Sequence, residues 1–136
     1  MAIKLVKGKV KNIFLPVLVS TAFTKDTIVE QTSGYINPAD DNDTVLAGVI
    51  RKAIASTDVD YATARRVPVT VPMEKSVIWE IDAINTFTVG TDEGLEFGIS
   101  DAGTLDHSDT TNKVFFVTKV VSATKVQGYL KFAGAY

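Results

Sequence analysis

The chain has 136 residues, 46% of them hydrophobic, which indicates one globular domain with a core of its own and excludes an intrinsically disordered protein. The formal net charge of −2 gives no sign of a nucleic-acid partner, and no apolar run approaches the ~18 residues of a membrane span. The chain has no cysteine, and His107 is its one histidine. Disulfides, thiolate metal sites and multi-histidine metal sites are therefore excluded within one chain.

Residues 1–12 form a basic segment that we expect to be an N-terminal arm or a first strand, followed by a single β domain over residues 13–136. Apolar residues alternate with its lysines, at Ile3, Lys4, Leu5, Lys7, Lys9 and Lys11. We expect no signal peptide, because the basic part is too long and Pro16 interrupts the apolar run that follows.

Charge is unevenly distributed along the chain. No acid precedes Asp26, whereas eight acids and no base lie between Lys75 and Lys113. Two interpretations of this asymmetry stay open. The acids can form a solvated surface, or the basic arm can dock on an acidic surface of a neighbouring subunit or partner.

Between residues 12 and 50 the sequence predicts short strands separated by turns. The apolar run over residues 12–19 contains Pro16, which is typical of a strand that is broken or lies at a sheet edge. The acidic segment over residues 37–44 predicts a solvated turn, because it lacks the glycine and the bidentate glutamate of an EF-hand calcium loop. Residues 45–50 predict a buried strand, in which Gly48 indicates a bulge or a close backbone approach.

Residues 65–82 are the most strongly patterned stretch of the chain. Large apolar side chains recur at every second position, at Val67, Val69 and Val71 and then at Val77, Trp79 and Ile81. This period predicts two half-buried strands, joined as a hairpin or as a step between two sheets. Pro68 and Pro72 flank or interrupt the first strand, so we expect an edge or bulged strand there. We expect Trp79, the only tryptophan, to lie in the core.

The remaining segments complete a β-rich pattern. Only residues 58–64 could hold a helical turn, capped by Ser56 or Thr57. Residues 113–121 and 126–132 predict strands, and residues 100–112 predict a polar loop. About eight to ten short strands, with turn signals every 8–12 residues or so, predict an all-β fold. We expect a single-domain small β-barrel or β-sandwich with at most one short helix and an extended N-terminal arm.

The sequence predicts no catalytic group, cofactor site or metal ligand. His107 lies near Ser100 and Ser108, but neighbouring residues of one loop rarely reach the geometry of a catalytic triad, so we expect a solvated loop histidine. Glu80 and Asp82 alternate with apolar residues on their strand, which indicates that they point to solvent rather than perform acid–base chemistry. We therefore expect the protein not to be an enzyme.

A resemblance to a known family depends on the order of several short motifs. They are FTKDTIVE at residues 23–30, PAD at 38–40, AGVI at 47–50, DVDYATA at 58–64, RVPVTVP at 66–72, a glycine-containing run at 89–106 and a β-rich run at 114–121. In this order they resemble the small capsid decoration proteins (cement or head-stabilising proteins) of tailed bacteriophages, over roughly residues 23–132.

This resemblance implies a structural virion protein that binds the outer surface of a phage capsid and stabilises it, commonly as a trimer. Its partners would be the major capsid protein and further copies of itself, with no nucleic acid and no membrane. It would be made in the host cytoplasm and located on the capsid exterior of the virion. The expected contact residues belong to the arm and to the C-terminal end, namely Ile3, Lys4, Leu5, Lys7, Lys9, Lys11, Phe132 and Tyr136.

Two alternatives to a decoration protein stay open. One is another phage structural β-protein, such as a tail-tube or head–tail connector subunit, which would assemble into rings or tubes without a shell. The other is a carbohydrate-binding module, suggested by Trp79 and the four tyrosines.

Overall fold

The computed structural model describes residues 3–43, 46–101 and 103–132, and within these it contains eleven strands and no helix. The all-β prediction is therefore confirmed. The segment around residues 58–64 forms successive four-residue turns, closed by hydrogen bonds from the Asp58 amide to the Ala55 carbonyl and from the Tyr61 amide to the Asp58 carbonyl. The possible helical turn at this position is not formed.

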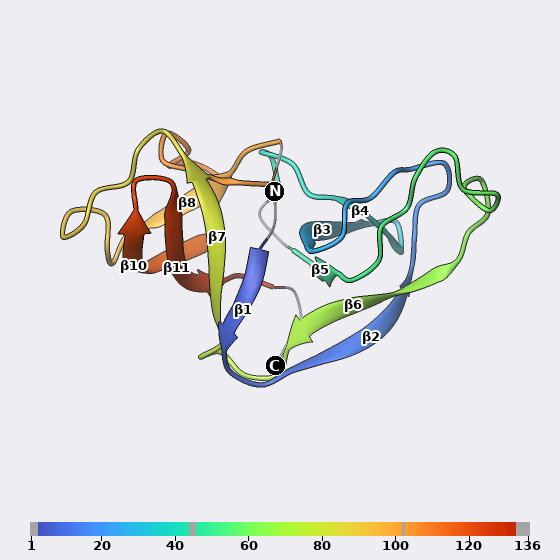
Figure 1. The fold of residues 1–136 in the computed structure, drawn as a ribbon, viewed down its shortest axis with the longest axis horizontal. Helices are drawn as coiled ribbons and strands as arrows, with labels where there is room; N and C mark the ends of the chain where they lie inside the picture. The colour runs from blue at the N-terminus through green and yellow to red at the C-terminus, as the bar shows by residue number, and fades with distance from the viewer. Residues whose placement is uncertain (1–2, 44–45, 102, 133–136) are drawn as a thin grey trace.

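Five strands close into a small barrel, and a sixth strand extends it at one side (Figure 1). The order in this sheet is β1-β7-β11-β10-β8-β9, and β9 also pairs with β7 in parallel, which closes the barrel. Its strands are β1 (Ile3–Lys7), β7 (Ile78–Ile84), β8 (Glu96–Ile99), β9 (Leu105–Asp106), β10 (Phe115–Ser122) and β11 (Lys125–Leu130). The closing strand β9 lies inside residues 100–112, where the sequence predicted only a polar loop.

The other five strands form a second, antiparallel sheet beside the barrel (Figure 1). The order in this sheet is β2-β6-β5-β3-β4, with bounds β2 (Val10–Pro16), β3 (Thr27–Thr32), β4 (Tyr35–Pro38), β5 (Gly48–Ile50) and β6 (Arg66–Pro72). The close backbone approach predicted at Gly48 is confirmed, because a Cβ atom there would lie 2.7 Å from the carbonyl oxygen of Thr70. Of the strand predicted over residues 45–50, Val45 lies outside the described residues.

A continuous two-stranded ribbon connects the two sheets. Strands β1 and β2 follow each other along the chain and pair antiparallel with β7 and β6, which also follow each other (Figure 1). Residues 65–82 are therefore a step between two sheets, the second of the two predicted arrangements. Gly8 lies at this step with φ +112°, and a Cβ atom at Gly8 would lie 2.8 Å from the Cα atom of Val77.

The prediction of an edge or bulged strand at Pro68 is wrong. Strand β6 lies between β2 and β5, and its register with β2 is unbroken. The carbonyl oxygen of Pro68 accepts the Arg51 amide on the β5 side at 2.9 Å, so the proline nitrogen also faces that side, beyond the end of β5 at Ile50. An interior strand tolerates this proline because the partner strand ends where its missing N–H would be needed.

Two apolar clusters pack on opposite faces of the second sheet. Trp79 is 2% exposed in the barrel cluster, where its ring meets that of Phe132 edge-on at 5.9 Å between centroids. The prediction that Trp79 lies in the core is confirmed. In strand β3, Ile28 belongs to the barrel cluster and its neighbour Val29 to the other cluster. Successive strand residues face opposite sides of a sheet, so the second sheet is a wall between the two cores.

Candidate functional site

The ribbon strands β1 and β2 each have a side that pairs with no other strand of the described residues, although the Ile3 amide at the start of β1 already donates to the carbonyl oxygen of Asp26 at 2.9 Å. Within the described residues, β1 pairs only with β7 and β2 only with β6, so each is the edge strand of its sheet. The prediction that the strand containing Pro16 lies at a sheet edge is confirmed. Edge strands present backbone N–H and C=O groups that another chain can pair with. We call these two strands, residues 3–16, the β1–β2 edge.

The β1–β2 edge carries the lysines named from the sequence. Lys4 contacts the carboxylate of Glu80 at 3.2 Å. In the part of the chain that the structure describes, no carboxylate lies within ion-pair distance of Lys7, Lys9 or Lys11. These three ammonium groups are therefore available for a partner's carboxylates.

Apolar side chains are exposed on the same edge. Leu5 and Val6 are about two-fifths exposed, and Phe14 is 60% exposed beside Pro68 across the β2–β6 pair. One backbone acceptor is already used, since the Arg66 guanidinium donates to the carbonyl oxygen of Phe14 at 3.2 Å. The edge thus combines exposed apolar side chains with three lysines that have no ion pair among the described residues.

Two further predicted contact residues, one at the start of the β1–β2 edge and one in the C-terminal part of the described chain, are buried. Ile3 is 2% exposed and Phe132 is 6% exposed, and both pack in the barrel cluster. Their side chains hold β1 and the C-terminal segment against the core. Tyr136 lies outside the described residues, as do residues 44, 45, 102 and 133–135.

Glu80 is held in a polar network on the outer face of the barrel. The alternation along its strand is as predicted, but the side chain is only 12% exposed, so the expectation that it points into solvent is wrong. Gln127 donates to it at 3.0 Å, and Lys4 and Lys125 lie at 3.2 and 4.0 Å. The hydrogen bond from Gln127 and the two ammonium charges hold the pKa of Glu80 below its usual range, against the effect of burial.

His107 lies in a turn with its side chain 36% exposed, but it makes fixed contacts that the sequence did not predict. Its Nε2 atom lies 2.9 Å from Oδ1 of Asp92, a carboxylate that is 4% exposed. The imidazole ring also stacks on Phe97 and meets Phe87 edge-on, at 5.0 and 4.9 Å between centroids. Fifteen residues separate the two partners, and no spacing motif in the sequence indicates the pair.

The serines near His107 are bonded elsewhere. Ser100 Oγ lies 2.6 Å from Thr104 Oγ1, and Ser108 Oγ donates to Asp106 at 2.7 Å. Among the described residues no hydroxyl group is hydrogen-bonded to the imidazole of His107. The structure therefore brings His107 to a carboxylate but not to a nucleophile.

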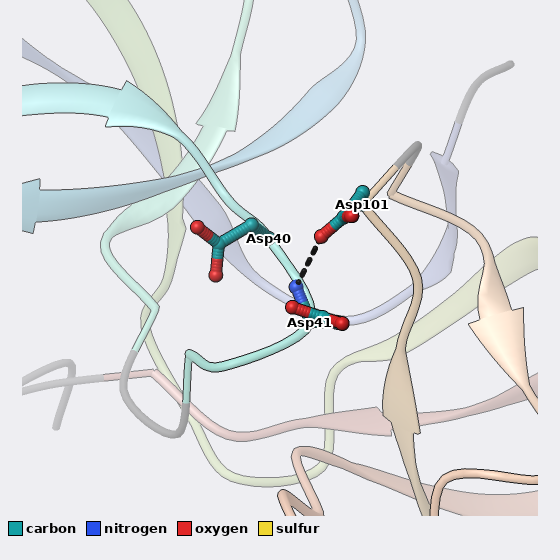
Figure 2. A group of neighbouring side chains, drawn as sticks. All are labelled: Asp40, Asp41 and Asp101. Carbon is teal, nitrogen blue, oxygen red and sulfur yellow. Dashed lines mark hydrogen bonds between the residues drawn. The ribbon is translucent and has the colours of Figure 1, made fainter.

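Three carboxylates meet where the turn after β4 approaches the loop after β8 (Figure 2). The backbone amide of Asp41 donates to Asp101 at 3.2 Å, and Asp40 lies beside them. Hydrogen bonding to Asp101 raises the pKa of Asp41, and the nearby negative charges act in the same direction. All three groups are exposed, and exposed carboxylates commonly gather without a cation, so we assign no metal to this cluster.

The described residues include no helix that is long and apolar enough to cross a membrane. The chain matches no protein-family model and no curated protein. The geometry of the β1–β2 edge, together with the motifs set out from the sequence, is therefore the basis for a proposed function.

Proposed function

We propose that the protein is a structural, non-enzymatic virion component that binds the outer surface of a phage capsid and stabilises it as a trimer. The observation that supports this most directly is the β1–β2 edge. It consists of two edge strands, with exposed apolar side chains and three lysines that have no ion pair within the described part of the chain. The order of sequence motifs resembles that of decoration proteins and points to the same function.

A decoration protein stabilises a shell by binding the assembled form better than the free subunits. On this edge, Phe14 and Leu5 would supply apolar contact area, and Lys7, Lys9 and Lys11 would orient the protein on capsid carboxylates. The contact would then weaken as ionic strength rises, because the lysines are exposed and their attraction is screened.

The test is co-sedimentation of the purified protein with undecorated phage capsids. We expect wild-type protein to pellet with a shell, and Lys7→Glu/Lys9→Glu/Lys11→Glu to bind it at least about tenfold more weakly. The matched control is Lys119→Glu, a charge reversal at an exposed lysine of β10 that is not part of the edge. Equal binding by the edge variant, or no binding of the wild type to any capsid tried, would contradict the proposal.

The assembly state distinguishes the remaining alternatives. Light scattering should give the molar mass of a trimer. Rings or tubes seen by electron microscopy without a shell would instead support a tail-tube or connector subunit. Trp79 is buried, so it cannot be the sugar-binding platform that first suggested a carbohydrate-binding module.

A further inference from the structure

A groove on the barrel lies outside the β1–β2 edge. Its volume is about 190 Å³, and β8, β10 and β11 contribute its walls. The lining includes three buried apolar residues, Val114, Phe115 and Leu130, and four more exposed ones, Glu96, Phe116, Tyr129 and Lys131. The groove is smaller than the roughly 300–1,000 Å³ of a pocket for a drug-sized ligand, so it suits a ligand no larger than one ring.

Two aromatic rings form one wall of this groove. Phe116 lies opposite Tyr129 on β11 and opposite Glu96 on β8. The rings of Phe116 and Tyr129 are nearly parallel, at 21°, with centroids 6.0 Å apart. Backbone pairing on both sides of β10 sets this register, which places both rings on the same face of the sheet.

The rim of the groove indicates the chemistry of its ligand. Glu96 and Lys131 are exposed and opposite in charge, and neither has an ion pair within the described part of the chain. Such a rim has no net charge and offers both hydrogen-bond acceptors and donors. Because β10 is already paired with β8 and β11, the groove cannot bind a peptide by adding a strand to it.

We propose that this groove binds one neutral pyranose ring of a saccharide. The C–H face of the sugar stacks on a ring face of the Phe116–Tyr129 pair that is turned away from the other ring, and its hydroxyl groups hydrogen-bond to Glu96 and Lys131. This inference does not depend on capsid binding, because the groove shares no residue with the β1–β2 edge.

The test is a titration with methyl glucopyranoside, methyl galactopyranoside and methyl N-acetylglucosaminide, followed by amide chemical shifts. We expect at least one of them to give saturable shifts at Glu96, Phe116, Tyr129 and Lys131, with a Kd of about 1–10 mM. Tyr129→Ala should weaken this binding about tenfold or more, whereas Tyr129→Phe should retain most of it because the ring remains.

Tyr35→Ala is the matched control, since Tyr35 is an exposed tyrosine on β4 of the second sheet, and it should bind as the wild type does. Glycerol, which has hydroxyl groups but no ring, should give no saturable shift. The proposal is overturned if no pyranoside gives saturable shifts in the groove, or if the well-dispersed spectrum of Tyr129→Ala responds as the wild type does.

Discussion

Gly8 lies where the ribbon passes from one sheet to the other, and its lack of a side chain allows the close approach to Val77 there. Its φ of +112° is strained for residues with a side chain, and an added Cβ would lie 2.8 Å from the backbone of Val77. We expect Gly8→Ala to lower the free energy of unfolding by about 2 kcal/mol or more, because the ribbon must shift to relieve this contact. Urea unfolding followed by the fluorescence of Trp79 measures the loss.

The control for this substitution is Gly34→Ala in the β3–β4 turn. Gly34 also has a positive φ, +87°, but an added Cβ would meet no atom within 4 Å. Its cost should therefore be the backbone strain alone, about 1 kcal/mol. If Gly8→Ala costs no more than Gly34→Ala, the close approach of the ribbon to Val77 does not constrain the fold.

At the scale of elements, Asp92 joins its own turn, residues 88–92, to the segment that follows strand β9. Its carboxylate accepts the Thr88 amide at 2.7 Å and the imidazole of His107, which follows the closing strand β9. Burial alone would raise the pKa of Asp92, but the hydrogen bonds from Thr88 and His107, together with the His107 charge, outweigh it and hold the pKa below its usual range.

The lowered pKa of Asp92 gives a signed prediction for stability. A carboxyl whose pKa is lower in the folded state stabilises the protein above its unfolded pKa, and this contribution is lost as pH falls through the folded pKa. We expect Asp92→Asn to cost about 1–3 kcal/mol at pH 7, and the difference from wild type to shrink from roughly pH 5 downward. Urea unfolding at several pH values in this range measures the free energy of unfolding of both proteins.

Glu96→Gln is the control for this pH dependence. Glu96 is exposed, so its loss should change stability by no more than about 0.5 kcal/mol at any pH. The outcome against this prediction is a difference in the free energy of unfolding between wild type and Asp92→Asn that stays constant from pH 7 into acid. The charge of the buried carboxylate would then not couple β9 to the rest of the barrel.

The elements that could be predicted from the sequence are those with a repeating pattern. The alternation at Val67, Val69 and Val71 predicted the strand β6, and the alternation around Trp79 predicted the strand β7. Strand β9 could not be predicted, because Leu105 is its only buried side chain and two residues cannot show a period. The interior position of β6 was also missed, since it depends on where β5 ends and not on Pro68 itself.

At the scale of the whole molecule, the sequence showed the lysines of the N-terminal segment but not which of them have an ion-pair partner. Which of them lack a partner depends on the pairing of Lys4 with Glu80 across β1 and β7, a contact between residues 76 positions apart. The Phe116–Tyr129 groove was missed for the same reason. Its residues come from three strands, and only the register of those strands brings them together.

The β1–β2 edge is useful for docking only if the two sheets hold a fixed relation, so we expect them to unfold together. Ile28 and Val29, adjacent in β3, anchor this strand in both clusters at once. Val67→Ala, a truncation in the cluster that lacks Trp79, should therefore destabilise the protein by about 1–3 kcal/mol and lower the urea midpoint seen by Trp79 fluorescence. Far-ultraviolet circular dichroism, which reports on all strands, should give the same midpoint as the fluorescence.

Val126→Ala is the matching truncation in the barrel cluster, and it should lower the urea midpoints of the fluorescence and circular dichroism signals equally. If Val67→Ala leaves the Trp79 midpoint unchanged while circular dichroism shows an earlier step, the two sheets are independent and the edge is not a single rigid surface.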